Sequence, residues 1–203
     1  MTDYTKLPVS DYLTALSAGT SAPGGGAAAA LTASQGVALM LMVLNFTDGH
    51  DMAKAPLLSS LPDRRDSFLE MIQQDIDAFN SVMAAYRLPR QSEPDKLART
   101  DAIQTSLQAA AAVPAEIVRE IAHLEPALSL LVEIGNKNLV TDTGIAASLF
   151  IAAIKASKLN LLINVRSMNS LNAASYDAVL ASTEELIARF ENIENQIADT
   201  LVA

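Results

Sequence analysis

Polar side chains gather at one place in an otherwise apolar sequence, between Gly135 and Asp142. Two amides and a cation follow the glycine directly, at Asn136, Lys137 and Asn138. Asp142 stands between two threonines where a helix is expected to begin, so it fits the position of an N-cap. Because a cap leaves the neighbouring amides unexplained, we also treat this stretch as a candidate binding site.

Three more polar residues, Asn160, Asn164 and Arg166, follow at the end of the apolar run that Asp142 leads into. Asn160 and Asn164 are one helical turn apart and share a face, whereas Asp142 lies about 27 Å away at 1.5 Å per residue. One straight helix cannot bring both ends into a single small pocket. Either the helix breaks near residues 155–158, or a second copy of the chain places its own helix start beside these asparagines.

A turn of three glycines, Gly24, Gly25 and Gly26, follows Pro23 and precedes an alanine-rich helix. Because these residues have no side chains, the amide N–H groups at the helix start could approach an anionic or carbonyl ligand. A flexible connection explains the same glycines, and the spacing alone favours it, because no complete phosphate-loop or dinucleotide motif is present.

Another carboxylate, Asp75, interrupts the apolar stripe of a helix predicted over residues 62–87. The stripe follows three- and four-residue spacing and comprises Phe68, Met71, Ile72, Phe79, Val82 and Tyr86. A carboxylate at a core position needs a partner or a purpose. A structural ion pair or amide contact and a role in a site are equally good explanations.

Composition predicts an all-α fold. Alanine and leucine dominate, aromatic residues make up 4% and tryptophan is absent, which suits closely packed helices better than strands. We expect one domain over residues 1–203, an up-and-down bundle of roughly six to eight helices. Two apolar runs, residues 27–46 and 144–163, are its central helices. Their polar residues, including Lys155 and Lys158 in the second run, argue against membrane spans.

The boundaries of the other helices are predicted from proline and from periodicity. We expect a loop with some helical turns over residues 45–61, a helix start at Pro62, a kink or restart at Pro114 and a short break at Pro126. Residues 172–203 form one long helix with an apolar seam that packs within the chain or against a second subunit.

Charge and composition exclude several classes of function. The net charge is −9 and the pI is near 4.6, so a nucleic acid would be repelled. The chain has no cysteine, and its two histidines, His50 and His123, belong to no motif with metal-ligand spacing, so we expect no metal. No secretory signal is visible at the N-terminus, which makes the cytoplasm the expected location.

The order of these features resembles the cyclodeaminase family, which comprises the C-terminal half of formimidoyltransferase-cyclodeaminase and free-standing bacterial relatives, some described as methenyltetrahydrofolate cyclohydrolases. The resemblance covers nearly the whole chain. Its motifs here are Ser21 to Ala30 with the glycine turn, Met42 to Thr47, Asp75 with Ala78-Phe79, Leu88-Pro89-Arg90, Val113-Pro114, Gly135 to Asn138, Thr141-Asp142 and Asn160 to Arg166. Where the family often has serine, this chain has Ala27 and Thr141.

The resemblance implies an α-helical homodimer that acts on a folate, without a further cofactor, near the glycine turn and the aspartate. Cyclodeamination asks the protein to hold two folate nitrogens in attacking geometry, to protonate the departing amine and to favour a developing cation. Asp142 is the first candidate for the carboxylate and Asp75 the second. Asn136, Asn138 and Asn164 would orient the pterin or the amidine, and Arg166, Lys137 or Arg90 would pair with the glutamate tail. The remaining proposed substrate-binding residues are Pro23, Gly24, Gly25, Gly26 and Asn160.

Two other functions remain open on the sequence. Methenyltetrahydrofolate hydrolysis uses the same ligand with water as the nucleophile. A non-catalytic helical assembly module would have no affinity for folate and no chemistry at Asp142.

Overall fold

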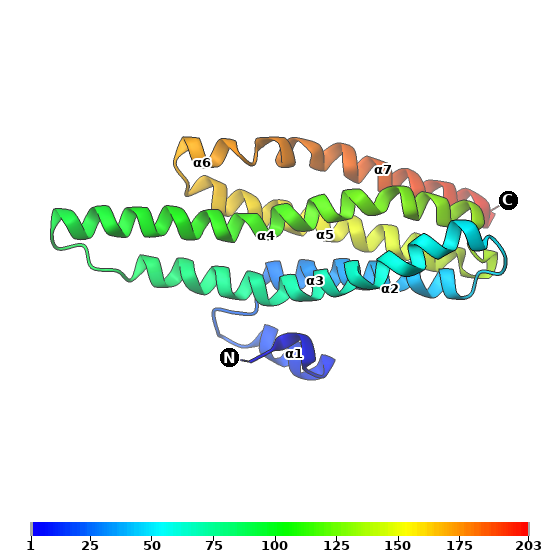
Figure 1. Ribbon diagram of the computed structural model, residues 1–203, viewed down its shortest axis with the longest axis horizontal. Coiled ribbons are helices and arrows are strands. Elements are labelled where there is room, and N and C mark those ends of the chain that lie inside the picture. Colours follow the sequence, from blue (N-terminus) through cyan, green and yellow to red (C-terminus); the bar gives the residue numbers. More distant parts are fainter. Residues whose placement is uncertain (1, 203) are drawn as a thin grey trace.

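The computed structural model describes residues 2–202, which form a long helical bundle without a strand among them (Figure 1). This confirms the all-α prediction. The α-helices are α1 Val9–Ser17, α2 Gly25–Asn45, α3 Asp51–Tyr86, α4 Glu93–Ile134, α5 Val140–Arg166, α6 Ser170–Ala174 and α7 Asp177–Val202, with short 3-10 turns η1 Tyr4–Lys6 and η2 Lys137–Leu139.

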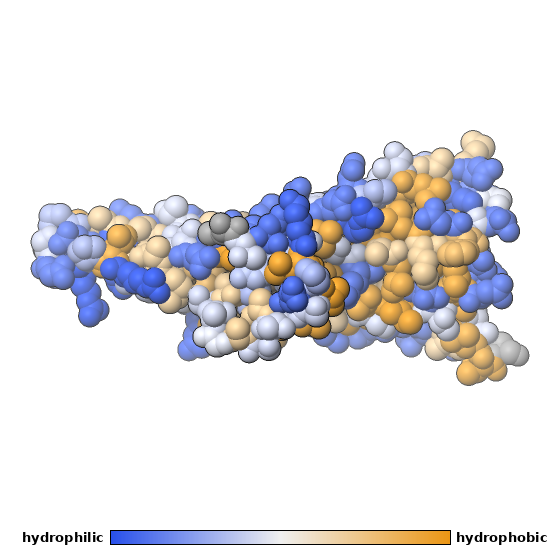
Figure 2. Space-filling view, turned by 90° about the horizontal axis from the view of Figure 1, so that it is seen from below, coloured by the Kyte–Doolittle hydropathy of each residue, from blue (hydrophilic) through white to orange (hydrophobic). Residues whose placement is uncertain are grey.

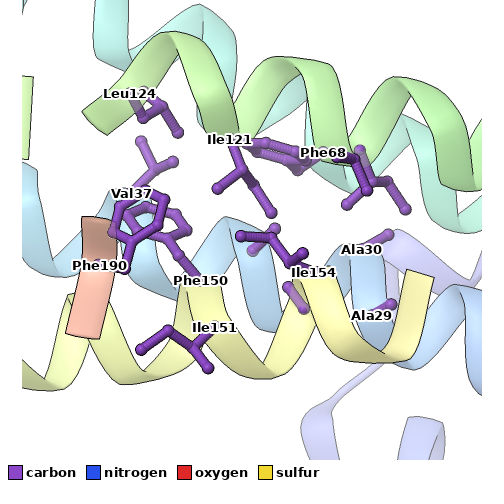
Figure 3. Packing of buried hydrophobic residues seen from close by; sticks show 14 of the residues in the cluster. Ala29, Ala30, Val37, Phe68, Ile121, Leu124, Phe150, Ile151, Ile154 and Phe190 are labelled. Carbon is purple, nitrogen blue, oxygen red and sulfur yellow. The ribbon is translucent and has the colours of Figure 1, made fainter. Parts of the chain in front are cut away.

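The two predicted central helices, α2 and α5, pack against each other and against α3, α4 and α7. They approach closely because α2 has Gly36 opposite the ring of Phe150 on α5, where a Cβ would lie 2.6 Å from a ring carbon. Phe150 and Phe190 of α7 are fully buried with their ring centroids 5.5 Å apart (Figure 3). Burial of each such side chain contributes roughly 1.5–3 kcal/mol to folding.

Both central helices are long and apolar enough to span a membrane by length and composition alone. Within the bundle, 56% of the most apolar window of α2 is buried, and 44% of that in Lys137–Arg166. The core helices of soluble proteins can be equally long and apolar.

The prolines do not divide the long helices as predicted. α3 begins at Asp51 and contains Pro62, so the loop predicted over residues 45–61 is mostly helix. α4 runs unbroken through Pro114 and Pro126. One proline in a helix costs about 3 kcal/mol or more. Since α4 buries a row of large apolar residues on α3 and α5, each worth about 1.5–3 kcal/mol, packing outweighs the missing hydrogen bonds.

α5 is a single helix from Val140 to Arg166, which excludes the first of the two alternatives, a break near residues 155–158. The single helix predicted over residues 172–203 is divided, because α6 ends at Ala174 and α7 begins at Asp177. The apolar seam packs within the chain, where α7 lies against α5 and α4. Its buried residues include Val179, Leu186 and Ile193.

The α3–α4 turn projects beyond the other helices at one end and forms a narrow arm (Figure 1). A small second core, made by Val82, Ala85, Ile103, Leu107 and Ala110, lies between these two helices. Seen from below, apolar side chains gather more densely over the wide half of the bundle than over the arm (Figure 2).

Candidate active site

A pocket of about 350 Å³ lies where the start of α2, the second half of α3, α4 and the end of α5 meet. Its lining residues are Ser21, Ala22, Gly24, Gly25, Gly26, Asp75, Phe79, Val82, Met83, Tyr86, Leu107, Ala110, Asn160, Ile163, Asn164 and Ser167. The pocket therefore joins the predicted glycine turn, Asp75 and the paired asparagines, which are far apart in the sequence.

The first turn of α2 holds the carboxylate of Asp75. The backbone N–H of Ala27 donates a hydrogen bond of 3.0 Å to Oδ2 of Asp75. The other oxygen lies against Gly26, where a Cβ would come within 2.0 Å of Oδ1. Gly26 is therefore required so that this carboxylate can rest on the helix start, where unpaired N–H groups and the helix dipole favour negative charge.

Two opposing effects set the protonation of Asp75. Burial raises the pKa of its carboxyl above the ordinary value, and the hydrogen bond from Ala27 lowers it by a smaller amount. The net result is a raised pKa, because burial disfavours the charged form. Such a carboxyl holds a proton at a higher pH than an exposed aspartate, as a proton donor must.

Tyr12 anchors the first helix close to this carboxyl. It is the one buried residue of α1, with 4% of its surface exposed. Burial raises the pKa of the Tyr12 hydroxyl, and the charge of Asp75 raises it further. The hydroxyl has no hydrogen-bond partner within residues 2–202.

Asn160 and Asn164 present acceptors to the pocket. The side-chain N–H of Asn160 donates to the backbone oxygen of Ala156 at 3.0 Å, and that of Asn164 donates to the backbone oxygens of Asn160 at 2.9 Å and Ala110 at 3.3 Å. Both N–H groups of the Asn164 amide are used, whereas Asn160 uses one of its two. The two side-chain oxygens and the second N–H of Asn160 therefore remain available to a ligand. Gly25 lies beside Asn160: a Cβ at Gly25 would be 3.5 Å from Nδ2 of Asn160, an ordinary van der Waals distance.

The apolar stripe of α3 continues after Asp75, and this second part of the stripe forms a wall of the pocket. Phe79 and Tyr86 follow Asp75 on the same face of α3 and are 39% and 43% exposed, because they face the pocket instead of the core. Met83, Leu107 and Ala110 were not predicted as lining residues. The spacing of Met83, eight residues after Asp75, could have identified it, whereas Leu107 and Ala110 depend on how α4 packs.

Asp75 is the one charged side chain among the described residues that line the pocket. The walls are otherwise apolar or carry neutral amides and hydroxyls. This arrangement can bind a flat, partly apolar ligand, donate a proton to it and then stabilise a positive charge with the carboxylate left behind.

The predicted residues Asn136, Lys137 and Asn138 lie at the opposite end of α5 and form the corner between α4 and α5. Asn136 donates from Nδ2 to the backbone oxygen of Phe46 at 2.6 Å and accepts from the N–H of Asn138 at 3.0 Å. Lys137 donates to the last carbonyls of α4, those of Val132 and Glu133. In one copy of the chain these side chains hold the corner together.

Asp142, Arg166, Arg90 and Pro23 also lie outside the pocket lining of one copy. Asp142 is half-buried in the first turn of α5, but the N-cap is Leu139, so the prediction of Asp142 as the cap is wrong. Arg166 is the exposed last residue of α5, and Arg90 lies in the α3–α4 turn, four residues beyond Tyr86. Pro23 is buried between the lining residues Ala22 and Gly24.

Residues 8–185 match the formiminotransferase-cyclodeaminase family, and the chain belongs to that family. It is 29% identical over 199 residues to methenyltetrahydrofolate cyclohydrolase of Methylorubrum extorquens, covering 95% of each chain.

Two further relatives bear different names. The formimidoyltransferase-cyclodeaminase of Rattus norvegicus is 29% identical over 163 residues, which cover 77% of this chain and 30% of the rat protein. The chain thus corresponds to less than a third of that enzyme. The crystal structure of formiminotetrahydrofolate cyclodeaminase from Thermotoga maritima has a TM-score of 0.80 and 28% identity, covering 96% of this chain and 95% of the other.

Proposed function

We propose that the protein is a folate-dependent one-carbon enzyme that converts formiminotetrahydrofolate to methenyltetrahydrofolate and releases ammonia. Family membership and the names of the relatives that match this chain support an enzyme acting on a folate derivative. They do not favour the alternative of a non-catalytic assembly module. The proposed unit is a single domain over residues 1–203, which we place in the cytoplasm as a homodimer.

The observation that carries the proposal is the position of Asp75, the pocket's one charged side chain among the described residues, on the first turn of α2. In the reaction, the second folate nitrogen attacks the formimino carbon, and the proton of the attacking nitrogen passes to the formimino nitrogen, which gives a neutral tetrahedral adduct with an NH2 group. Asp75 gives its proton to this group, the bond between the carbon and this nitrogen breaks, and ammonia leaves. The resulting methenyl cation then faces the Asp75 carboxylate, which stabilises it by opposite charge.

The remaining groups orient the substrate. The side-chain oxygens of Asn160 and Asn164 accept hydrogen bonds from N–H groups of the pterin or the amidine, and the N–H groups at Gly25 and Gly26 donate to a carbonyl. Holding both nitrogens in attacking geometry is the larger part of the catalysis, because the reaction is intramolecular.

The glutamate tail of the folate needs a cation, which the pocket lining of one copy lacks. The pocket extends along α3 to Tyr86, towards the turn that carries Arg90. Arg90 is our candidate at that end, since a guanidinium matches a carboxylate with two parallel hydrogen bonds. Lys137 and Arg166 remain candidates only if a second copy contributes them or covers that side.

Methenyltetrahydrofolate hydrolysis is the second candidate. The relative from Methylorubrum extorquens, which matches along nearly its whole length, is named a cyclohydrolase, and it is about as similar as the cyclodeaminase from Thermotoga maritima. The same pocket would then bind the methenyl cation opposite Asp75, and water would add to the carbon.

One assay separates these functions. Purified protein is mixed with formiminotetrahydrofolate, and ammonia and the methenyl chromophore are followed; a second reaction starts from methenyltetrahydrofolate and follows the loss of that chromophore. Ammonia release supports the cyclodeaminase, and accelerated loss of the chromophore without ammonia release in the first reaction supports the cyclohydrolase. Absence of turnover in both reactions would contradict the proposed enzyme.

A further inference from the structure

One arginine is held in a fixed position at the Tyr86 end of the pocket, on the arm formed by α3 and α4 (Figure 1). Nε and Nη2 of Arg99 both donate to the backbone oxygen of Tyr86, at 3.4 and 3.2 Å. The guanidinium carbon of Arg99 also lies 5.7 Å from the centre of the Tyr86 ring, as in a cation–π contact. Since Tyr86 lines the pocket, Arg99 packs directly against a residue of the pocket wall.

Arg99 also lies on the face of α4 that forms the pocket. Arg99, Ile103, Leu107 and Ala110 follow each other at spacings of four, four and three residues, so they share one side of the helix. Leu107 and Ala110 line the pocket. Arg99 precedes Leu107 by about 12 Å along the helix axis, in the direction of the arm. It therefore continues this face of α4 just beyond the lining residues.

The guanidinium of Arg99 has donors left for a ligand. It carries five N–H groups, and the carbonyl of Tyr86 accepts from two of them. Among the described residues, nothing accepts from Nη1 and no carboxylate pairs with Arg99. The edge formed by Nη1 and Nη2 is therefore free, and such an edge binds a carboxylate with two parallel hydrogen bonds.

The surroundings of Arg99 are rich in positive charge, although the chain as a whole has a net charge of −9. Arg87 and Arg90 lie just after the end of α3, and Arg166 is the last residue of α5. Within residues 2–202, none of these three arginines has a carboxylate partner. An anion is therefore attracted to this end of the pocket.

The carboxylates at the start of α4 do not neutralise Arg99. Glu93 forms an ion pair with Lys96, and Asp95 accepts a hydrogen bond in the capping box at the helix start. Asp101 lies about 200° around the helix from Arg99, on the other side of α4. Arg99 thus remains able to bind an anion that reaches it along the pocket.

The groups along α3 follow the order of the groups in a folate. Asp75 lies at one end, Phe79 and Tyr86 form the wall, and Arg99 stands against Tyr86. Asp75 and Tyr86 are about 16 Å apart along the helix axis. In a folate, a flat benzoyl ring joins the reacting nitrogens to the glutamate carboxylates. An acid, an aromatic wall and a cation in this order therefore fit the ligand along its length.

We propose that Arg99 binds a carboxylate of the glutamate tail and makes the pocket selective for ligands that carry this tail, while Tyr86 holds the guanidinium in place. The identity of the ligand rests on the proposed function. Arg90 lies in an exposed turn, whereas Arg99 is half-buried and is positioned before the ligand binds. Such preorganisation lowers the entropic cost of the contact.

Two ligands that differ only in the tail test this role. Tetrahydrofolate carries the glutamate, and in tetrahydropteroylamide a neutral amide replaces it. We expect the wild type to prefer tetrahydrofolate and Arg99→Gln to bind it about tenfold more weakly, because a charge-assisted hydrogen bond is lost. The affinity for tetrahydropteroylamide should not change, which also shows that the variant is folded. Isothermal titration calorimetry measures both affinities.

The outcomes that contradict the proposal are distinct. An Arg99→Gln variant that keeps the wild-type preference, or that loses affinity equally for both ligands, would overturn it. Lys96→Gln is the matched control, because it removes a positive charge one turn away on the same arm and leaves Arg99 in place. An equal loss of preference in Lys96→Gln would show that the general charge of the arm, and not Arg99, selects the tail.

Tyr86→Leu tests the positioning of the guanidinium. This variant removes the ring under Arg99, so the preference for tetrahydrofolate over tetrahydropteroylamide should fall. Combining Tyr86→Leu with Arg99→Gln should reduce the preference no further, because both changes remove the same interaction. A Tyr86→Leu protein with the full wild-type preference would show that the ring does not position Arg99.

Turnover separates this proposal from the proposed function. If the wild type binds tetrahydrofolate with the expected preference but turns over neither formiminotetrahydrofolate nor methenyltetrahydrofolate, the proposed function fails and the role of Arg99 stands. If the wild type is active and binds both ligands equally well, the role of Arg99 fails and the proposed function stands.

Discussion

At the scale of single residues, the proposed chemistry depends on the contact between Gly26 and Asp75. Gly26→Ala would place a methyl group 2.0 Å from Oδ1 of Asp75, so the carboxylate must move away from the start of α2. We expect turnover to fall at least tenfold, while alanine leaves the helix about as stable or more stable. Steady-state kinetics and urea unfolding measure the two effects separately.

The adjacent glycine supplies the matched control. At Gly25 a Cβ would lie 3.5 Å from Asn160, an ordinary van der Waals distance. Gly25→Ala should therefore reduce turnover much less than Gly26→Ala. Equal losses would mean that any side chain in this turn blocks the ligand, and that the position of Asp75 is not the cause.

Removing the carboxyl should impair the reaction strongly. Asp75→Asn keeps the shape of the side chain and an acceptor for the N–H of Ala27, but it has no proton to donate. General acid catalysis contributes about 10²–10⁴-fold, so we expect a loss of kcat in that range. Asp77→Asn, on the exposed side of the same helix, serves as the control. Full activity of Asp75→Asn would remove Asp75 from the mechanism.

The raised pKa of Asp75 also predicts how stability and activity depend on pH. The ordinary aspartate value is 3.8, and burial raises it in the folded protein. The stability contributed by this group is therefore complete below pH 3.8 and is lost as pH rises through the raised pKa. Asp75→Asn should be more stable than the wild type above that pKa, and the difference should shrink in acid. Urea unfolding at pH 4 and pH 8 measures this difference.

The same titration limits the reaction. If the protonated carboxyl is the donor, the rate of cyclodeamination should fall as the pH rises through the raised pKa of Asp75. A pH–rate profile that is flat on its alkaline side would contradict this role.

At the scale of helices, the contact between α2 and α5 decides the stability of the bundle. Gly36→Ala would place a methyl group 2.6 Å from the fully buried ring of Phe150. Overpacking of this kind costs roughly 1–3 kcal/mol. In Gly144→Ala the nearest atom belongs to Ile197, 3.4 Å away, so this control should be tolerated. Urea unfolding compares the two variants, and a stable Gly36→Ala protein would show that the helices can move apart.

Helix type was predictable from composition and periodicity, whereas the helix boundaries were not. Pro62, Pro114 and Pro126 indicated starts and breaks because proline disfavours a helix interior locally. The long burial surfaces of α3 and α4 override that preference, and such packing cannot be read from a local window of sequence.

The candidate site was predictable in part for a similar reason. Asp75 was identified because it interrupts an apolar stripe, and the glycines because they precede a helix. Their contact could not be predicted, because it depends on how α2 lies across α3. The role of Asn136 could not be predicted either, because an amide side chain in a turn is typical both of ligand-binding residues and of residues that stabilise a corner between helices.

At the scale of the whole molecule, the exposed apolar side chains of α5, including Ile145, Leu159 and Ile163, are consistent with the proposed homodimer. Leu159→Glu places a charge at a position of α5 that is 70% exposed. We expect this variant to sediment as a monomer and to lose activity. Leu97→Glu, at a 67% exposed position on α4 in the projecting arm, should remain dimeric and serves as the control. A wild-type protein that is monomeric and fully active at micromolar concentration would contradict the proposed homodimer.

The arm formed by α3 and α4 affects how a ligand enters. Val82, Leu107 and Ala110 line the pocket and also belong to the small core between these two helices, which is separate from the main core. Few apolar residues hold that region, so it can open locally at a lower free energy than global unfolding requires. The pocket would then widen when α3 and α4 move apart, while the rest of the bundle stays folded. Bound folate should slow amide hydrogen exchange most in this region.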